Sequence, residues 1–167
     1  EQLAKRVKEM AEEISKDYAG KDLLVVGILK GSVLFTSDLI KNISIPCEID
    51  FMAVSSYGNS AQTSGVVRIL KDLDSDIENK HVLIVEDIVD TGTTLSYLLE
   101  YLKARKAASI EIVALLDKEA RRTSNVSAKY KGFDVPDEFI VGYGIDYAEK
   151  YRNLPFIGAL KEEIYNK

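Results

Sequence analysis

Two adjacent carboxylates and a run of hydroxyl side chains follow one strongly apolar stretch of this sequence. The stretch is Val82 to Val85, the acids are Glu86 and Asp87, and residues 90 to 94 spell DTGTT. An apolar strand carries such acids to its carboxyl end, which is where open α/β sheets bind ligands. Hydroxyls and free backbone N–H groups at the start of a helix bind phosphate. We therefore expect residues 90 to 94 to hold a phosphate, and the two acids to hold hydroxyls or a divalent cation.

The same residues also have a purely structural interpretation. Asp and Thr are favoured at the N-terminal ends of helices, so Glu86, Asp87 and Asp90 could simply cap a helix. Any one of these residues fits capping as well as it fits binding. The complete ordered run favours the binding site, because capping alone does not require the acids, the glycine and the threonines in this order.

Strands and helices alternate along the chain, and they must position these groups. Apolar residues at helical spacing from Leu3 to Tyr18 predict an opening helix that ends near Gly20. Leucines at positions 95, 98, 99 and 102 predict another helix, and Val33 to Ile40 a third. Short apolar runs predict strands over residues 23–29, 45–55, 66–70, 82–85, 110–116 and 139–141. This order predicts an α/β fold, with a mainly parallel sheet flanked by helices on both faces.

Two segments fall outside this alternation. Residues 56 to 65, SYGNSAQTSG, are small and polar, and they predict a loop between two strands. The tail after Phe139 has turns and aromatic residues but no long helical pattern, which predicts a small subdomain over the sheet edge.

Size and charge limit the kinds of protein that this can be. The chain has 167 residues, a formal net charge of −5, one cysteine and one histidine. The length fits one domain, and the negative charge argues against a nucleic-acid or membrane surface, so we expect small molecules or other subunits as partners. A lone cysteine forms no internal disulfide, and no apolar run approaches the roughly 20 residues of a membrane span. These features predict a cytoplasmic protein.

The run VLIVEDIVDTGTTL, residues 82 to 95, resembles the phosphoribosyl pyrophosphate signature of type I phosphoribosyltransferases. The similarity continues in order through LKGS at 29–32, SSYG at 55–58, LLDK at 115–118 and FIVGYGIDYAEKYRNLPFIG at 139–158. The last segment resembles the 6-oxopurine branch, the hypoxanthine-guanine phosphoribosyltransferases. This resemblance implies a single domain over residues 1–167 with a small hood from about 139–167, to which the N-terminus could also contribute.

The resemblance also implies an activity. A member of this branch transfers the 5-phosphoribosyl group of phosphoribosyl pyrophosphate to N9 of hypoxanthine or guanine, giving IMP or GMP plus pyrophosphate in purine salvage. It implies Mg²⁺ as the cofactor, held by Glu86, Asp87 and Asp146, and a homodimer or homotetramer as the assembly. Because the transition state resembles an oxocarbenium ion, which water destroys, the loop at 55–65 is implied to close as a lid.

The resemblance assigns the phosphoribosyl side of the site residue by residue. Glu86 and Asp87 are implied to contact the ribose hydroxyls, directly or through magnesium. The 5′-phosphate is implied to lie on the turn made of Asp90, Thr91, Gly92, Thr93 and Thr94. The pyrophosphate group is implied to contact Lys30, Gly31, Ser56, Tyr57 and Arg152, with a non-proline cis peptide between Leu29 and Lys30.

The resemblance assigns the base side to Asp90 again and to three further positions. Asp90 is implied to be the catalytic residue, as general base or proton acceptor at N7 of the purine. Lys118 is implied to donate to the 6-oxo group, which favours hypoxanthine and guanine over adenine. Phe139 is implied to stack on the base, and Ile140 to read its edge through backbone groups. Read without the resemblance, Phe139 is a core aromatic and Arg152 a surface charge.

Two other classes of protein stay open on the sequence alone. A nucleotide sensor could reuse this fold without catalysis, although the chain has no basic segment for nucleic acid. A receiver-like phosphate switch also has an acidic pair at a strand end, but it does not explain the threonines or the segment at Phe139. The alternating acids from Asp72 to Glu78 lack the glycine and glutamate of a calcium loop, so we expect a solvated turn there.

Overall fold

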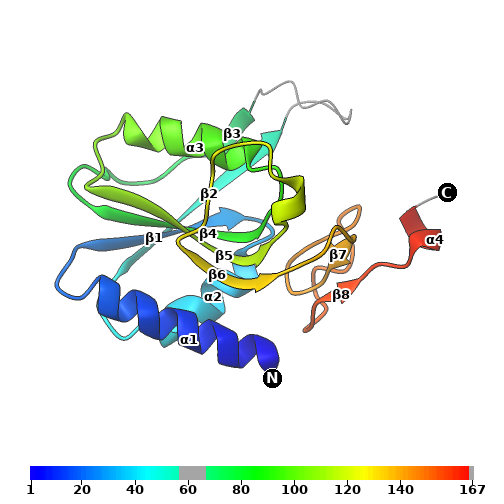
Figure 1. The fold of residues 1–167 in the computed structure, drawn as a ribbon. Helices are drawn as coiled ribbons and strands as arrows, with labels where there is room; N and C mark the ends of the chain where they lie inside the picture. Colours follow the sequence, from blue (N-terminus) through cyan, green and yellow to red (C-terminus); the bar gives the residue numbers. More distant parts are fainter. Residues whose placement is uncertain (57–66, 166–167) are drawn as a thin grey trace.

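The computed structural model describes residues 1–56 and 67–165, except for the side chain of Ser56. Its main sheet has six strands in the order β3-β2-β1-β4-β5-β6 (Figure 1). Their bounds are β1 Leu23–Leu29, β2 Glu48–Ser56, β3 Val67–Lys71, β4 His81–Val89, β5 Ser109–Asp117 and β6 Tyr130–Asp134. All neighbouring pairs are parallel except β2 with β3. The predicted mainly parallel α/β sheet is therefore confirmed.

Helices cover both faces of this sheet. The helices α1 (Gln2–Asp17) and α2 (Val33–Asn42) lie on one face, and α3 (Thr93–Lys103) lies on the other (Figure 1). Successive strand residues point to opposite faces. Val25 of β1 accordingly packs in the core under α1 and α2, whereas Val26 packs in the core under α3. Among the described residues, no helix has the length and apolar character needed to cross a membrane.

A second, two-stranded sheet lies beyond one end of the main sheet (Figure 1). It pairs β7 (Ile140–Val141) with β8 (Gly158–Ala159) in antiparallel order, and Leu160 N–H donates to Phe139 O at 2.7 Å. A short 3₁₀ turn at Glu119–Arg121 and the terminal helix α4 (Glu162–Tyr165) complete the described elements. This is the small subdomain that the tail composition predicts.

Three features differ from the sequence prediction. Strand β6, with the sequence YKGFD, was not predicted, because a short edge strand with one glycine has no apolar alternation. Strand β4 continues to Val89, so Glu86 and Asp87 lie within the strand rather than after it. The segment from Asp72 is not simply solvated: Leu73 and Ile77 are buried in it. The side chains of Tyr101 and Arg105 also donate to the Asp72 carboxylate.

Candidate active site

A cavity of about 280 Å³ lies at the carboxyl end of β4. It is lined by ten of the predicted residues, namely Gly31, Glu86, Asp87, Asp90, Thr91, Gly92, Thr93, Thr94, Asp146 and Arg152. They come from the loop after β1, from β4, from the turn before α3, and from the irregular segment after β7. The fold thus brings together groups more than one hundred residues apart in the sequence.

The turn from Asp90 to Thr94 leads directly into α3. Gly92 has a φ of 81°, a left-handed conformation that glycine adopts without a steric penalty. A Cβ atom at this position would lie 2.4 Å from Ser124 Oγ, so a larger residue would also displace the Ser124 hydroxyl. Asp90 Oδ1 accepts from Thr91 N–H at 2.6 Å, and Thr91 Oγ1 accepts from Thr93 N–H at 3.4 Å. The first N–H groups of α3 have no partner within the helix, which suits them to phosphate.

Arg122 holds this turn through its backbone, and the sequence analysis does not predict this role. Its Nε donates to Asp90 O at 3.0 Å and its Nη1 to Val126 O at 2.8 Å, while Nη2 contacts the buried carboxylate of Asp117. The planar guanidinium therefore joins the end of β5, the turn and the loop before β6. Its sequence context, RRTS, is part of no motif, and without β6 the surrounding loop could not be placed.

The same loop also holds the next carbonyl of the turn. Thr91 O accepts from Thr123 N–H at 3.1 Å and from Ser124 Oγ at 3.1 Å. With the Arg122 bond to Asp90, two consecutive carbonyls of the turn are tied to residues 122–124. These bonds orient the N–H groups of the turn before any ligand arrives.

Burial changes the proton affinity of the two acids on β4. The pKa of Glu86 is raised well above its usual value, first by desolvation and then by the charges of Asp87 and Asp90. Desolvation raises the pKa of Asp87 to about 6, although the Ile88 N–H bond and the charge of Arg152 oppose it. Half-buried carboxylates with too little positive charge nearby suit a divalent cation, which would neutralise them.

The three predicted magnesium ligands line one cavity, but they do not form one compact cluster. In the described part of the chain, one group of acids has ligand atoms all within 4.8 Å of one another, and it consists of Asp117, Glu119 and Asp134. Glu86, Asp87 and Asp146 therefore do not by themselves form a complete ligand set, and a magnesium ion held by them would need further oxygen ligands, as magnesium usually does.

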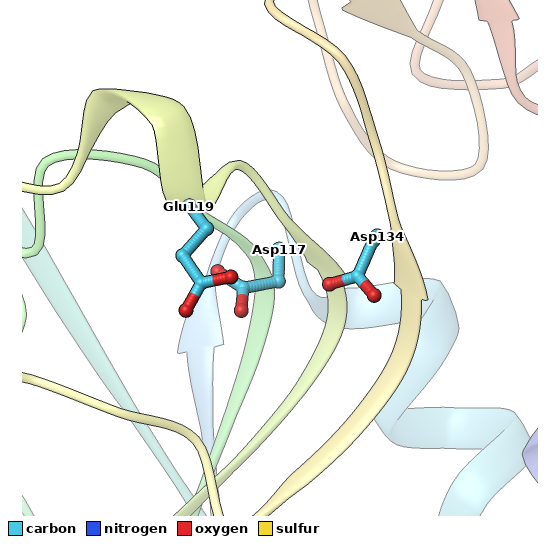
Figure 2. Close-up of side chains that lie close together, drawn as sticks. All are labelled: Asp117, Glu119 and Asp134. Atoms are coloured by element: carbon cyan, nitrogen blue, oxygen red, sulfur yellow. The ribbon is translucent and has the colours of Figure 1, made fainter.

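The acid cluster outside the cavity is balanced by bases. Figure 2 shows the carboxylates of Asp117, Glu119 and Asp134 turned toward a common space at the ends of β5 and β6. Lys131 Nζ lies 3.8 Å from Asp117 and 2.8 Å from Asp134, and Arg122 contacts Asp117 as well. These ion pairs account for the cluster as a structural element.

A second cavity, of about 440 Å³, adjoins the first. Lys118, Phe139 and Ile140 line it, and Ile88, Asp90 and Asp146 line both cavities. Lys118 is positioned directly after β5 by its N–H bond to Val89 O at 2.8 Å. Asp90 therefore lies at the junction of a hydroxyl-rich cavity and one with an aromatic ring and a lysine.

The Phe139 ring already has aromatic neighbours. Tyr165 stacks on it with centroids 5.1 Å apart and an interplanar angle of 27°, and Tyr147 contacts it edge-on at 5.3 Å. The ring is still 39% exposed. A planar ligand that stacks on Phe139 must use the remaining face or displace Tyr165.

The loop after β1 approaches Asp87 closely. The peptide between Leu29 and Lys30 is cis, as predicted. A Cβ atom at Gly31 would lie 2.0 Å from Asp87 Oδ2, so a larger residue there would displace the Asp87 carboxylate. Lys30 Nζ pairs with Glu149 at 3.1 Å rather than lining the cavity. Ser56 ends β2 and Tyr57 lies outside the described residues, so their predicted contacts with pyrophosphate stay predictions.

The sequence of the chain is similar to proteins of one known family. Residues 1–148 match the model of the phosphoribosyl transferase domain. The chain is 58% identical over 159 residues to the hypoxanthine-guanine phosphoribosyltransferase of Staphylococcus aureus, covering 95% of this chain and 89% of that protein. It is 52% identical over all 167 residues to the bifunctional protein TilS/HprT of Listeria monocytogenes, of which it covers 26%.

Solved structures agree as well. A crystal structure of a hypoxanthine phosphoribosyltransferase from Staphylococcus aureus superposes with a TM-score of 0.97 at 55% identity, covering 99% of this chain and 90% of that one. The six-stranded sheet with its flanking helices is the fold of type I phosphoribosyltransferases. The chain belongs to the phosphoribosyl transferase domain family and, within it, to the hypoxanthine-guanine phosphoribosyltransferases, so it is a transferase.

Proposed function

We propose that this chain transfers the 5-phosphoribosyl group of phosphoribosyl pyrophosphate to N9 of hypoxanthine or guanine, giving IMP or GMP plus pyrophosphate in purine salvage. The observation that carries the proposal is the position of Asp90 on both cavities. One cavity has the acids and the N–H groups suited to a sugar phosphate, and the other has the lysine and aromatic ring suited to an oxopurine. The bond between sugar and base would form where the two meet.

The phosphoribosyl group would be held by residues of the first cavity. Asp90 to Thr94 would bind the 5′-phosphate through backbone N–H groups and hydroxyls, with Arg122 keeping the turn in place. Glu86 and Asp87 would hold the ribose hydroxyls. Gly31, Arg152 and, across the rim, Lys30 would contact the pyrophosphate group, together with Ser56 and Tyr57 as the sequence predicts.

Catalysis would combine positioning with one proton transfer. Holding the base and the anomeric carbon in line makes their reaction effectively intramolecular. As N9 bonds to the anomeric carbon, the Asp90 carboxylate would accept the proton from N7 of the base. The lid that the resemblance implies over residues 55–65 lies for the most part outside the described residues, so exclusion of water from the cationic transition state by its closure stays a prediction. Mg²⁺, held by Glu86, Asp87 and Asp146, would supply positive charge that neutralises the pyrophosphate leaving group.

The base would be selected by the second cavity. Lys118 has donors but no acceptor, so it would favour a 6-oxo group over the 6-amino group of adenine. Phe139 would stack on the purine, and the backbone of Ile140 would bond to its edge. With adenine bound, the Lys118 donor would have no acceptor opposite it. A polar group left unpaired in this way makes a site discriminate strongly against the wrong ligand.

The setting of the enzyme completes the proposal. We expect a cytoplasmic enzyme, consistent with a single cysteine and with helices too short or too polar to span a membrane in the described ranges. We expect one domain over residues 1–167, with residues 139–167 as its hood, that assembles as a homodimer or homotetramer.

The test is a steady-state assay of phosphoribosyl pyrophosphate with each of hypoxanthine, guanine, xanthine and adenine, in the presence of magnesium. Turnover of hypoxanthine or guanine, with adenine at least a hundredfold poorer in kcat/KM, is expected. Nucleotide binding without any turnover would instead support a sensor.

Lys118→Ala tests the base contact. Because Lys118 lines the second cavity and not the first, its loss should raise the KM for hypoxanthine about tenfold while the KM for phosphoribosyl pyrophosphate changes less than twofold. Lys103→Ala, an exposed lysine at the far end of α3, is the control. Equal losses for both substrates would remove Lys118 from its assigned role.

A further inference from the structure

Glu149 joins two basic residues that the proposed function assigns to pyrophosphate. One carboxylate oxygen, Oε2, lies 3.1 Å from Lys30 Nζ, and the other, Oε1, lies 3.2 Å from Arg152 Nη2. Each oxygen thus has its own cation. A phosphate group that bridged Lys30 and Arg152 would make the same two contacts, because its oxygens also accept from separate cationic donors.

The backbone brings Glu149 to this position. Ala148, Glu149 and Tyr151 all have left-handed φ values, of 51°, 68° and 77° respectively. Residues other than glycine rarely adopt this backbone conformation. Glu149 N–H donates to Asp146 Oδ2 at 2.9 Å, which holds the turn against the cavity wall. Gly144, in the same irregular segment, approaches Gly31 so closely that a Cβ atom would lie 2.4 Å from Gly31 O. Specific contacts rather than a regular element therefore place the carboxylate between its two cations.

The contact is ionic and displaceable. Hydrogen bonds from Lys30 and then from Arg152 hold the pKa of Glu149 below its usual value, so the side chain is an anion at neutral pH. Its side chain is 64% exposed and that of Lys30 is 68% exposed. Solvent-exposed ion pairs contribute little to stability, so a ligand with more negative charge can replace the carboxylate.

Arg152 can leave Glu149 without losing its position. Its Nη1 donates to Gly144 O at 2.7 Å, and Nη2 also lies 3.5 Å from Asp146. Its buried Nε has no hydrogen-bond partner among the described residues. The anchor through Nη1 is therefore independent of Glu149, and a change of partner at Nη2 breaks no bond at Nε.

We infer that Glu149 competes with the pyrophosphate group for Lys30 and Arg152. The inference rests on the proposed function, which assigns pyrophosphate to these two cations. In the free enzyme the carboxylate occupies them, and a bound pyrophosphate group displaces it. The competition lowers the affinity for the substrate phosphoribosyl pyrophosphate and for the product pyrophosphate alike, which favours product release. A carboxylate that merely braced the two cations for binding would have the opposite effect.

The test is binding of inorganic pyrophosphate, with magnesium, to the full chain and to Glu149→Gln by calorimetry. Glutamine keeps the size of the side chain but removes its charge. The Kd for pyrophosphate should fall about threefold, as should the KM for phosphoribosyl pyrophosphate, while the KM for hypoxanthine stays within twofold. Raising the ionic strength to about 1 M should shrink the difference, because salt screens exposed charges. Glu149→Ala should shift the Kd in the same direction.

The matched control is Glu100→Gln, which removes the same charge from an exposed ion pair with Lys103 on α3. It should leave the Kd for pyrophosphate unchanged. Weaker or unaltered pyrophosphate binding in Glu149→Gln overturns the inference. If the unmodified chain turns over hypoxanthine while Glu149→Gln fails in this way, only the inference is lost. If the unmodified chain neither turns over hypoxanthine nor binds pyrophosphate, the proposed function is lost with it.

Discussion

Asp90 has a distinct position among the acids of the site. Glu86 and Asp87 are half-buried on β4, where burial first, and then the charges of neighbouring acids, raise the pKa of each. Asp90 is exposed, directly follows the last residue of β4, and lines both cavities. Its Oδ1 already accepts from Thr91 N–H, so the carboxylate is oriented by the turn that it begins. In the proposed function, one residue would thus both accept the proton of the base and support the turn that binds the phosphate.

Asp90→Asn separates these two roles. The amide oxygen can still accept from Thr91 N–H, so the turn should keep its shape and both KM values should stay within about twofold. Without a carboxylate to take the N7 proton, kcat should fall at least tenfold, about 1.4 kcal/mol of barrier. Steady-state kinetics measure both effects, with Asp74→Asn at an exposed position as control. Unchanged turnover would show that Asp90 is not the proton acceptor.

At the scale of elements, the site depends on a loop that contacts no substrate in the proposal. Residues 122–124 hold the carbonyls of Asp90 and Thr91, and Arg122 links them to the end of β5. Because β5 and β6 are parallel neighbours, the segment that connects them leaves β5 at its carboxyl end, and there residues 122–124 bond to the turn. The order of β5 and β6 therefore helps to position the support for this turn.

Arg122→Lys tests this support. A lysine keeps the charge beside Asp117, but one ammonium cannot reach Asp117, Asp90 O and Val126 O together. The KM for phosphoribosyl pyrophosphate should rise about tenfold, with a smaller change in the KM for hypoxanthine.

The control for this variant is Arg105→Lys, which alters another half-buried ion pair, with Asp72, away from both cavities. It should affect thermal stability without a selective change in KM. If both variants change the two KM values in the same ratio, Arg122 has only a general structural role.

For the molecule as a whole, the site has a cost in stability. Four segments meet around half-buried acids that repel one another, and this repulsion destabilises the folded state. The net stability of a folded protein is only about 5–15 kcal/mol, so such a destabilisation is a sizeable part of it. The Asp87 pKa of about 6 lies above its unfolded value of 3.8, so the folded state binds more protons between these values. Stability should therefore fall as the pH rises through this window and stay lower above it.

Asp87→Asn should remove this cost. Asparagine keeps an acceptor for Ile88 N–H but carries no charge. In the presence of a chelator, the variant should be more stable than the unmodified chain at about pH 7.5, by at most about 3 kcal/mol and by less where solvent screens the charge. The gain should vanish near about pH 4. Urea unfolding at both pH values measures it, with exposed Asp76→Asn as control. Equal or lower stability at the higher pH would contradict the prediction.

Local sequence patterns were sufficient for the elements and for the turn that opens α3. The spacing of apolar residues along the chain is enough to predict buried strands and amphipathic helices. The strand β1 and the helix α3 lie where this spacing predicts them. The acids and threonines from Glu86 to Thr94 are close together in the chain, so their proximity at one strand end followed directly. The resemblance extended the prediction to distant positions such as Lys118 and Arg152, which line the two cavities.

Contacts between distant segments could not be derived from local pattern. The edge strand β6 and the Arg122 support lie in no periodic pattern or motif. Lys30 and Glu149 lie in two separate motifs, but neither motif indicates that the two side chains meet. The raised pKa values of Glu86 and Asp87 likewise depend on how much protein surrounds them. Burial and long-range pairing arise only when the sheet has formed and its loops have packed against one another, which is why they belong to the folded molecule and not to any stretch of its chain.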